Sequence, residues 1–83
     1  MTSHKTPQIE HHIDATGLEC PQPLMRLKTE LQHVAAGAYV EITTTDPHSD
    51  LDFTIWCERF GHEIVSKTAD GEISSFIIRK SET

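Results

Sequence analysis

The sequence lacks the features of membrane, secreted and nucleic-acid-binding proteins. It has no apolar run of the roughly 18 residues that a transmembrane helix needs, and its first residues contain no apolar segment of a secretory signal. Its seven lysines and arginines are scattered among 13 acidic residues, and the formal net charge is −6, whereas nucleic-acid binding needs a concentrated basic surface. We therefore expect a cytoplasmic protein that binds no membrane and no nucleic acid directly, with an acidic surface suited to a basic protein partner.

Cysteine is scarce as well: Cys20 and Cys57 are the two present among 83 residues. One possible disulfide is too few for a disulfide-stabilised scaffold, so two free thiols in a reducing compartment are the simpler interpretation. The sequence has no Cys-x-x-Cys, and its six histidines are not paired at helical spacing, which disfavours a metal site. A chain of this length forms one small domain, so we expect a monomer with no cofactor and no metal.

The periodicity of apolar residues predicts six elements of secondary structure. Alternating apolar and polar residues indicate strands, whereas apolar residues at three- and four-residue spacing indicate helices. The expected strands cover 9–13, 39–45, 63–68 and 72–80, and the expected helices cover about 21–36 and 49–60. Gly37 and Gly61 are natural helix ends, and Ser49 with Asp52 resembles a capping box at the start of the second helix. The segment Ala69-Asp70-Gly71 favours a hairpin turn.

This order of elements, β-α-β-α-β-β, predicts a two-layer α/β (α+β) sandwich with a four-stranded mixed sheet. Helical crossovers favour parallel pairing of the first three strands, and the hairpin adds the fourth strand antiparallel. The strands alternate more than strands covered on both faces do, so we expect both helices on one face. The single domain would cover residues 9–80, after a flexible extension at 1–8 and before a polar tail at 81–83.

The second expected helix carries an apolar stripe formed by Phe53, Trp56, Cys57 and Phe60. Side chains at this spacing share one helix face and pack into the core. Free cysteines are among the most buried residue types. We therefore interpret Cys57 as a structural thiol and the three aromatic side chains as core residues.

Cys20 is the first candidate for chemistry, because it stands where a loop is expected to become a helix. A helix N-terminus favours a thiolate. Against this, Pro21 and Pro23 remove two N–H donors, and Glu19 repels negative charge. A buried Cys20 is the alternative, but the polar neighbour and the stiff prolines favour exposure. The sequence thus predicts an exposed thiol of moderate reactivity.

No second catalytic group is spaced to serve Cys20. A cysteine hydrolase needs a histidine base, and the nearest histidines in the sequence are His11, His12 and His33. A domain of this size has little room for a substrate cleft. A lone nucleophile that carries a group between larger proteins needs neither, and the sequence favours that role.

The chain resembles a known family. The signature Asp-x-x-Gly-Leu-x-Cys-Pro-x-Pro of the TusA (SirA-like) sulfur-carrier proteins is matched by Asp14-Ala15-Thr16-Gly17-Leu18-Glu19-Cys20-Pro21-Gln22-Pro23. Further matches are Lys28, Leu31, Gly37, Asp46-Pro47, Asp52, Trp56-Cys57, Gly61-His62-Glu63 and Ile78-Arg79-Lys80. The resemblance covers residues 9–80, the whole of the expected domain.

The resemblance implies a fold like that of the C-terminal domain of bacterial translation initiation factor three. It also implies that Cys20 accepts sulfane sulfur as a persulfide from a cysteine desulfurase or a rhodanese-like donor and passes it to an acceptor protein. Asp14, Gly17, Pro21 and Pro23 would support the loop and the helix start. The family serves tRNA 2-thiouridine synthesis, molybdenum-cofactor assembly and sulfur oxidation, and the sequence does not choose among them.

Two alternatives to a sulfur carrier remain at this point. The fold likeness also suits a non-catalytic module that binds RNA or a regulatory partner, although the acidic charge counts against RNA. A redox-sensing thiol would need Cys57 as the resolving cysteine for Cys20, which the apolar position of Cys57 disfavours.

Overall fold

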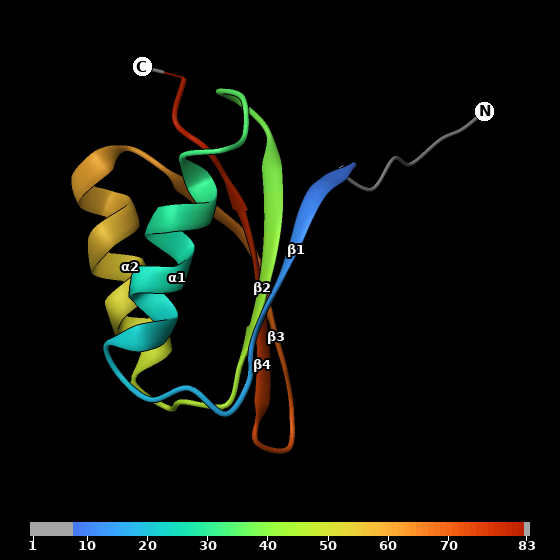
Figure 1. Ribbon diagram of the computed structural model, residues 1–83, viewed down its shortest axis with the longest axis vertical. Helices are drawn as coiled ribbons and strands as arrows, with labels where there is room; N and C mark the ends of the chain where they lie inside the picture. Colours follow the sequence, from blue (N-terminus) through green and yellow to red (C-terminus); the bar gives the residue numbers. More distant parts are fainter. Residues whose placement is uncertain (1–7, 83) are drawn as a thin grey trace.

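The computed structural model describes residues 8–82 and confirms the predicted order of elements. The elements are β1 (Ile9–Ala15), α1 (Gln22–Leu31), β2 (Tyr39–Thr44), α2 (Ser49–Phe60), β3 (Glu63–Asp70) and β4 (Ile73–Arg79). Both helices cover the same face of the sheet (Figure 1), so the two-layer prediction is confirmed. Residues 1–7 of the expected extension lie outside the described part of the chain.

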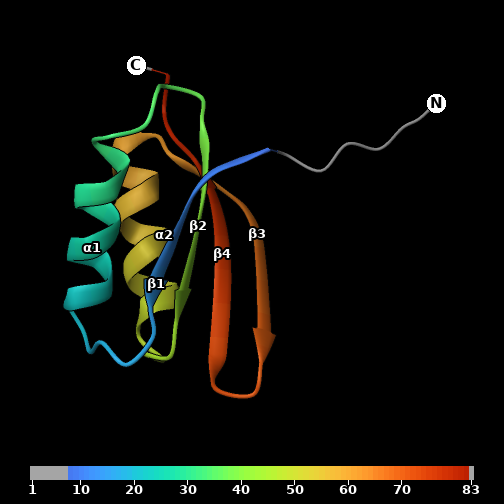
Figure 2. The same cartoon turned by 45° about the vertical axis from the view of Figure 1, so that its right-hand side comes forward.

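The four strands are ordered β1-β2-β4-β3. β1 and β2 pair in parallel, with Ile13 opposite Ile42, and β4 is antiparallel to both of its neighbours. The prediction that the first three strands pair in parallel is therefore wrong for β3, which runs in the same direction as β2 but pairs with β4. Figure 2 shows the β3–β4 hairpin on the side of the sheet away from β1.

The apolar content of β4 explains its central position. Phe76 and Ile78 of β4 are buried under the helices, whereas every residue of β3 is exposed or half-buried. An edge strand gains least from burial and tolerates charged side chains, so the more polar strand takes the edge. Hydrophobic periodicity within each strand carries no information about this order.

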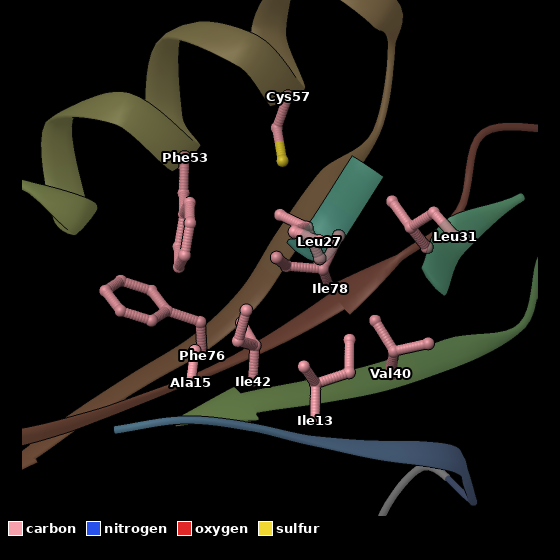
Figure 3. Packing of buried hydrophobic residues seen from close by; sticks show 10 residues of the cluster. All are labelled: Ile13, Ala15, Leu27, Leu31, Val40, Ile42, Phe53, Cys57, Phe76 and Ile78. Atoms are coloured by element: carbon pink, nitrogen blue, oxygen red, sulfur yellow. The ribbon is translucent and has the colours of Figure 1, made fainter. Parts of the chain in front are cut away.

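The core lies between the sheet and the two helices (Figure 3). The buried apolar residues are Ile13, Ala15, Leu27, Leu31, Val40, Ile42, Phe53, Cys57, Phe76 and Ile78. The rings of Phe53 and Phe76 meet edge to face, with centroids 5.0 Å apart and an interplanar angle of 80°, a favoured geometry for aromatic pairs.

The prediction for the stripe on α2 is confirmed for Phe53 and Cys57 and wrong for Phe60. Phe53 and Cys57 point from α2 into the core (Figure 3). The half-buried Trp56 packs against the core. Phe60, at the end of α2, is 54% exposed, because it packs on Trp56, with ring centroids 5.8 Å apart, rather than on the sheet. No helix in residues 8–82 is long and apolar enough to cross a membrane.

Every element except α2 differs from the prediction at one or both ends, and the main differences concern α1, the hairpin and the C-terminal segment. The prediction that α1 continues to Gly37 is wrong: the helix ends at Leu31, because the amide nitrogens of residues 32–34 bond to carbonyl oxygens three residues earlier, as in a 3₁₀ turn. The hairpin turns at Gly71-Glu72, since β3 continues to Asp70 and pairs it with Ile73. Ser81, expected in a loose tail, is buried, and its amide donates to Nδ1 of His62 at 2.8 Å.

Candidate functional site

Cys20 lies in the loop between β1 and α1. This loop and the one between β2 and α2 run side by side at one end of the molecule (Figure 1), because parallel strands end at the same edge of their sheet. Cys20 is exposed, whereas Cys57 is buried, and both are free thiols. The exposure predicted for Cys20 and the core position predicted for Cys57 are confirmed.

Asp14 and Gly17 shape the first half of the β1–α1 loop. Oδ1 of Asp14 accepts hydrogen bonds from the amide of Thr16 at 3.0 Å and from its hydroxyl at 2.6 Å, and these bonds hold the pKa of the Asp14 carboxyl below its ordinary value. Gly17 has φ +82°, a conformation that favours glycine. Its amide donates to Oγ1 of Thr45 at 2.9 Å, which ties this loop to the one after β2.

The two prolines lie where α1 begins. Pro21 is the N-cap residue and Pro23 is buried in the first turn, where a missing N–H costs no helical bond. The Cys20–Pro21 peptide bond is cis. The amide of Gln22 donates to the carbonyl of Glu19 at 2.8 Å. The structure thus places Gly17, Cys20, Pro21 and Pro23 in one loop-to-helix segment, whereas Asp14, predicted after the strand, lies inside β1 just before it.

The loop between β2 and α2 is held by hydroxyl groups. The buried Oγ1 of Thr44 lies 3.1 Å from Oγ of Ser49 and accepts a hydrogen bond from the amide of Asp46 at 3.1 Å. The predicted capping box between Ser49 and Asp52 is therefore wrong. Ser49 is already inside the helix, and its hydroxyl contacts Thr44 in the core. Within residues 8–82, the side chain of the N-cap residue, His48, makes no capping hydrogen bond.

The carboxylate of Asp52 faces Cys20 instead. Oδ2 of Asp52 accepts a hydrogen bond from Sγ of Cys20 at 3.2 Å, across 32 positions of sequence. Apart from its match to the family, Asp52 is predicted from the sequence only as part of the helix cap. A signal was available, since Asp52 lies in the first turn of α2, at the same end of the parallel crossovers as Cys20.

The pKa of Cys20 is raised above its ordinary value. The largest cause is the hydrogen bond to Asp52, followed by desolvation and by the negative charges of Asp52 and Asp46. The expected lowering by the start of α1 is therefore outweighed. A thiolate here would face two carboxylates, and Pro21 offers it no N–H.

A shallow groove of about 600 Å³ opens beside the thiol. Its lining residues are Gly17, Leu18, Glu19, Cys20, Thr45, Asp46, Pro47 and His48. Within residues 8–82, Oδ2 of Asp46 is buried without a hydrogen-bond partner, and Oδ1 lies 3.4 Å from Nδ1 of His48. The sequence did not identify His48 as a neighbour of this groove.

The two β1 histidines near Cys20 in the sequence are engaged elsewhere. Nε2 of His11 lies 2.7 Å from Oε1 of Glu30, and Nδ1 of His12 lies 2.8 Å from Oε1 of Glu41. Neither residue lines the groove beside Cys20. The groove thus presents an exposed thiol among acidic groups.

The family model described as sulfurtransferase TusA matches residues 11–80. The chain belongs to the TusA family. A protein of Pseudomonas putida (strain W619) named sulfur carrier protein TusA is 37% identical over 68 residues, which cover 82% of this chain and 85% of that protein. The putative sulfur carrier protein YrkI of Bacillus subtilis (strain 168) is 35% identical over 68 residues, covering 82% of this chain and 91% of that protein.

A solved structure supports the same membership. The crystal structure of a SirA-like protein from Desulfitobacterium hafniense matches with a TM-score of 0.74 and 26% identity, covering 87% of this chain and 99% of that chain. The likeness covers the fold described above, with its mixed four-stranded sheet and both helices on one face.

Proposed function

We propose that this TusA-family protein carries sulfane sulfur as a persulfide on Cys20. The observation that carries the proposal is the contrast between the two thiols. Cys20 is exposed on the loop beside the groove. Cys57 is 2% exposed in the core, and burial raises its pKa to about 11. Since the thiolate is the nucleophile, Cys20 is the thiol that a partner protein reaches.

Loading Cys20 is a redox-neutral exchange. The Cys20 thiolate attacks the terminal sulfur of a donor persulfide, the donor S–S bond breaks, and the donor cysteine leaves as a thiolate that takes up a proton. A new S–S bond joins Sγ of Cys20 to the transferred sulfur. An acceptor thiolate then attacks that terminal sulfur and restores the Cys20 thiol. Neither step needs a cofactor, and the partner proteins supply the remaining catalytic groups.

The donor in this proposal is a cysteine desulfurase or a rhodanese-like protein, and the acceptor is the next protein of a sulfur relay. Glu19, Asp46 and Asp52 surround the thiol with negative charge, which favours a partner whose docking surface is basic. The possible endpoints are tRNA 2-thiouridine synthesis, molybdenum-cofactor assembly and sulfur oxidation.

Loading can be measured directly. The purified protein is incubated with a cysteine desulfurase and cysteine, and its intact mass is recorded before and after reduction. We expect a gain of one sulfur atom that a reductant removes, that disappears in Cys20→Ser and that persists in Cys57→Ala. Alanine is the better control at position 57, because a serine hydroxyl buried among apolar groups would lack a partner. Absence of the adduct with desulfurases, thiosulfate and polysulfide alike would refute the proposal.

A further inference from the structure

The contact between Cys20 and Asp52 determines which atom carries the hydrogen. The atoms Sγ and Oδ2 are 3.2 Å apart, within hydrogen-bond distance for sulfur. An ionised carboxylate accepts hydrogen bonds and has no proton to donate. The hydrogen therefore belongs to sulfur, and the contact forms only while Cys20 is a thiol. Ionisation of Cys20 would replace it by repulsion between two negative charges.

The other groups around Cys20 add to this effect. Asp46 and His48 face the groove from the loop before α2, and Glu19 faces it from the loop that carries Cys20 itself. No lysine or arginine lines this groove in the described chain. Two basic side chains of other elements are paired with other carboxylates: Lys67 with Asp50, and Arg26 with Glu30. Among the residues that line this groove in the described chain, no cationic side chain thus offsets the carboxylate that contacts the thiol.

We propose that Asp52 is a positioning residue that keeps the empty carrier's Cys20 protonated and directed toward α2 until the contact is broken. A protonated thiol is a weak nucleophile and resists oxidation. An exposed carrier thiol held in this form therefore stays reduced and unreacted between its encounters with the donor and the acceptor protein. A donor that brings a cationic group to Asp52 would free the sulfur at the moment of docking.

Loading ends the contact by itself. Once Sγ of Cys20 is bonded to a second sulfur, it has no hydrogen left to donate to Asp52. The terminal sulfur carries the proton or the negative charge, and an anion there is repelled by Asp52 and Asp46. The loaded sulfur then turns away from α2 and becomes accessible to the acceptor. This part of the inference rests on the proposed function, whereas the behaviour of the empty thiol does not.

The pH dependence of Cys20 alkylation tests the inference on the empty carrier. The rate of reaction with iodoacetamide is measured from pH 6 to 11 for the wild type and for Asp52→Asn, which keeps the shape of the side chain and removes its charge. We expect the midpoint of the Asp52→Asn profile at lower pH than that of the wild type, and a faster reaction at neutral pH. Asp50→Asn is the matched control, because Asp50 lies on the same helix turn but pairs with Lys67.

The outcomes are distinct. A midpoint unchanged in Asp52→Asn, or shifted equally in Asp50→Asn, overturns the inference. Asp52→Glu keeps the charge and should retain a midpoint above that of Asp52→Asn, which a purely structural role would not produce. If Asp52→Asn does not fold, the wild type is compared with Asp52→Glu and Asp46→Asn, since the carboxylates of Asp52 and Asp46 both raise the Cys20 pKa. Removal of the Asp46 charge should then lower the midpoint of the alkylation profile. An unchanged midpoint in Asp46→Asn contradicts the inference.

A second measurement separates this inference from the proposed function. The same variants are loaded with inorganic polysulfide at neutral pH, and the sulfur adduct is followed by intact mass. Asp52→Asn should load faster than the wild type, and Asp50→Asn should load at the wild-type rate. If none of the proteins is loaded by any donor, the carrier proposal fails, while the alkylation profile still decides whether Asp52 controls the thiol.

Discussion

The buried thiol of Cys57 makes the stability of the fold depend on pH in the alkaline range. Cys57 is 2% exposed beside Phe53, and desolvation raises its pKa from 9.0 to about 11. Between these values the unfolded chain has lost the proton and the folded chain keeps it, so the free energy of unfolding falls as pH rises. Two units correspond to about 3 kcal/mol. A domain of this size is stable by roughly 4–12 kcal/mol, so the loss is a large share.

The perturbation is Cys57→Ala. The two proteins compared are Cys20→Ser and the double variant Cys20→Ser/Cys57→Ala, so that no second thiol titrates. Alanine at position 57 removes contacts in the core and costs about 1 kcal/mol at every pH. Below pH 9 the alanine variant should therefore be the less stable protein. The two proteins should become equally stable near pH 10, and above about pH 10 the alanine variant should be the more stable.

Urea denaturation followed by the fluorescence of Trp56, the one tryptophan in the chain, measures this difference. A change of about 3 kcal/mol moves a urea midpoint by roughly 1–3 M in a small domain. The remaining titrating groups are common to both proteins and cancel in the comparison. Parallel stability profiles, with a constant difference from pH 7 to 11, would refute the reasoning that Cys57 is held as a buried neutral thiol.

Two further predictions concern the loop and the C-terminal segment. Gly17→Ala should lower the free energy of unfolding by about 1 kcal/mol, because φ +82° strains alanine even though the space around its Cβ is open; equal stability in urea would contradict this. The pKa of His62 is lowered, first by desolvation and then by the charge of Lys80, and Nδ1 must stay unprotonated to accept the Ser81 amide. His62 therefore stabilises the fold fully above its ordinary pKa of 6.5, and this stabilisation is lost as pH falls through the lowered pKa. The NMR signals of the His62 ring should titrate with a midpoint below pH 6.5. A midpoint at or above pH 6.5 would contradict the account.

The elements of the fold and the position of Cys20 follow from local sequence. Periodicity in β2 and α2 marks which residues are buried, and Pro21 and Pro23 mark where α1 starts. The order of the strands does not follow, because the central position of β4 depends on competition between whole strands for burial. Phe60 lies seven residues after Phe53, a spacing that predicts the same buried helix face. At the end of α2, however, Phe60 packs on Trp56 instead.

The chemistry around Cys20 was less predictable than its position. The pattern of Ser49 followed by Asp52 fits a capping box, and only the packed structure shows that Thr44 engages Ser49 while Asp52 faces Cys20. The direction of the Cys20 pKa shift depends on carboxylates that are distant in the sequence. Local sequence gives the partial charge at the start of α1, which is the weaker influence here.

The most direct test of the central claim is to locate the transferred sulfur at residue level. The protein is loaded by a desulfurase with cysteine, alkylated while folded, digested, and the two cysteine peptides are weighed. The account predicts one additional sulfur atom on the peptide that contains Cys20 and none on the peptide that contains Cys57. Sulfur on Cys57, or an equal share on both peptides, would contradict it.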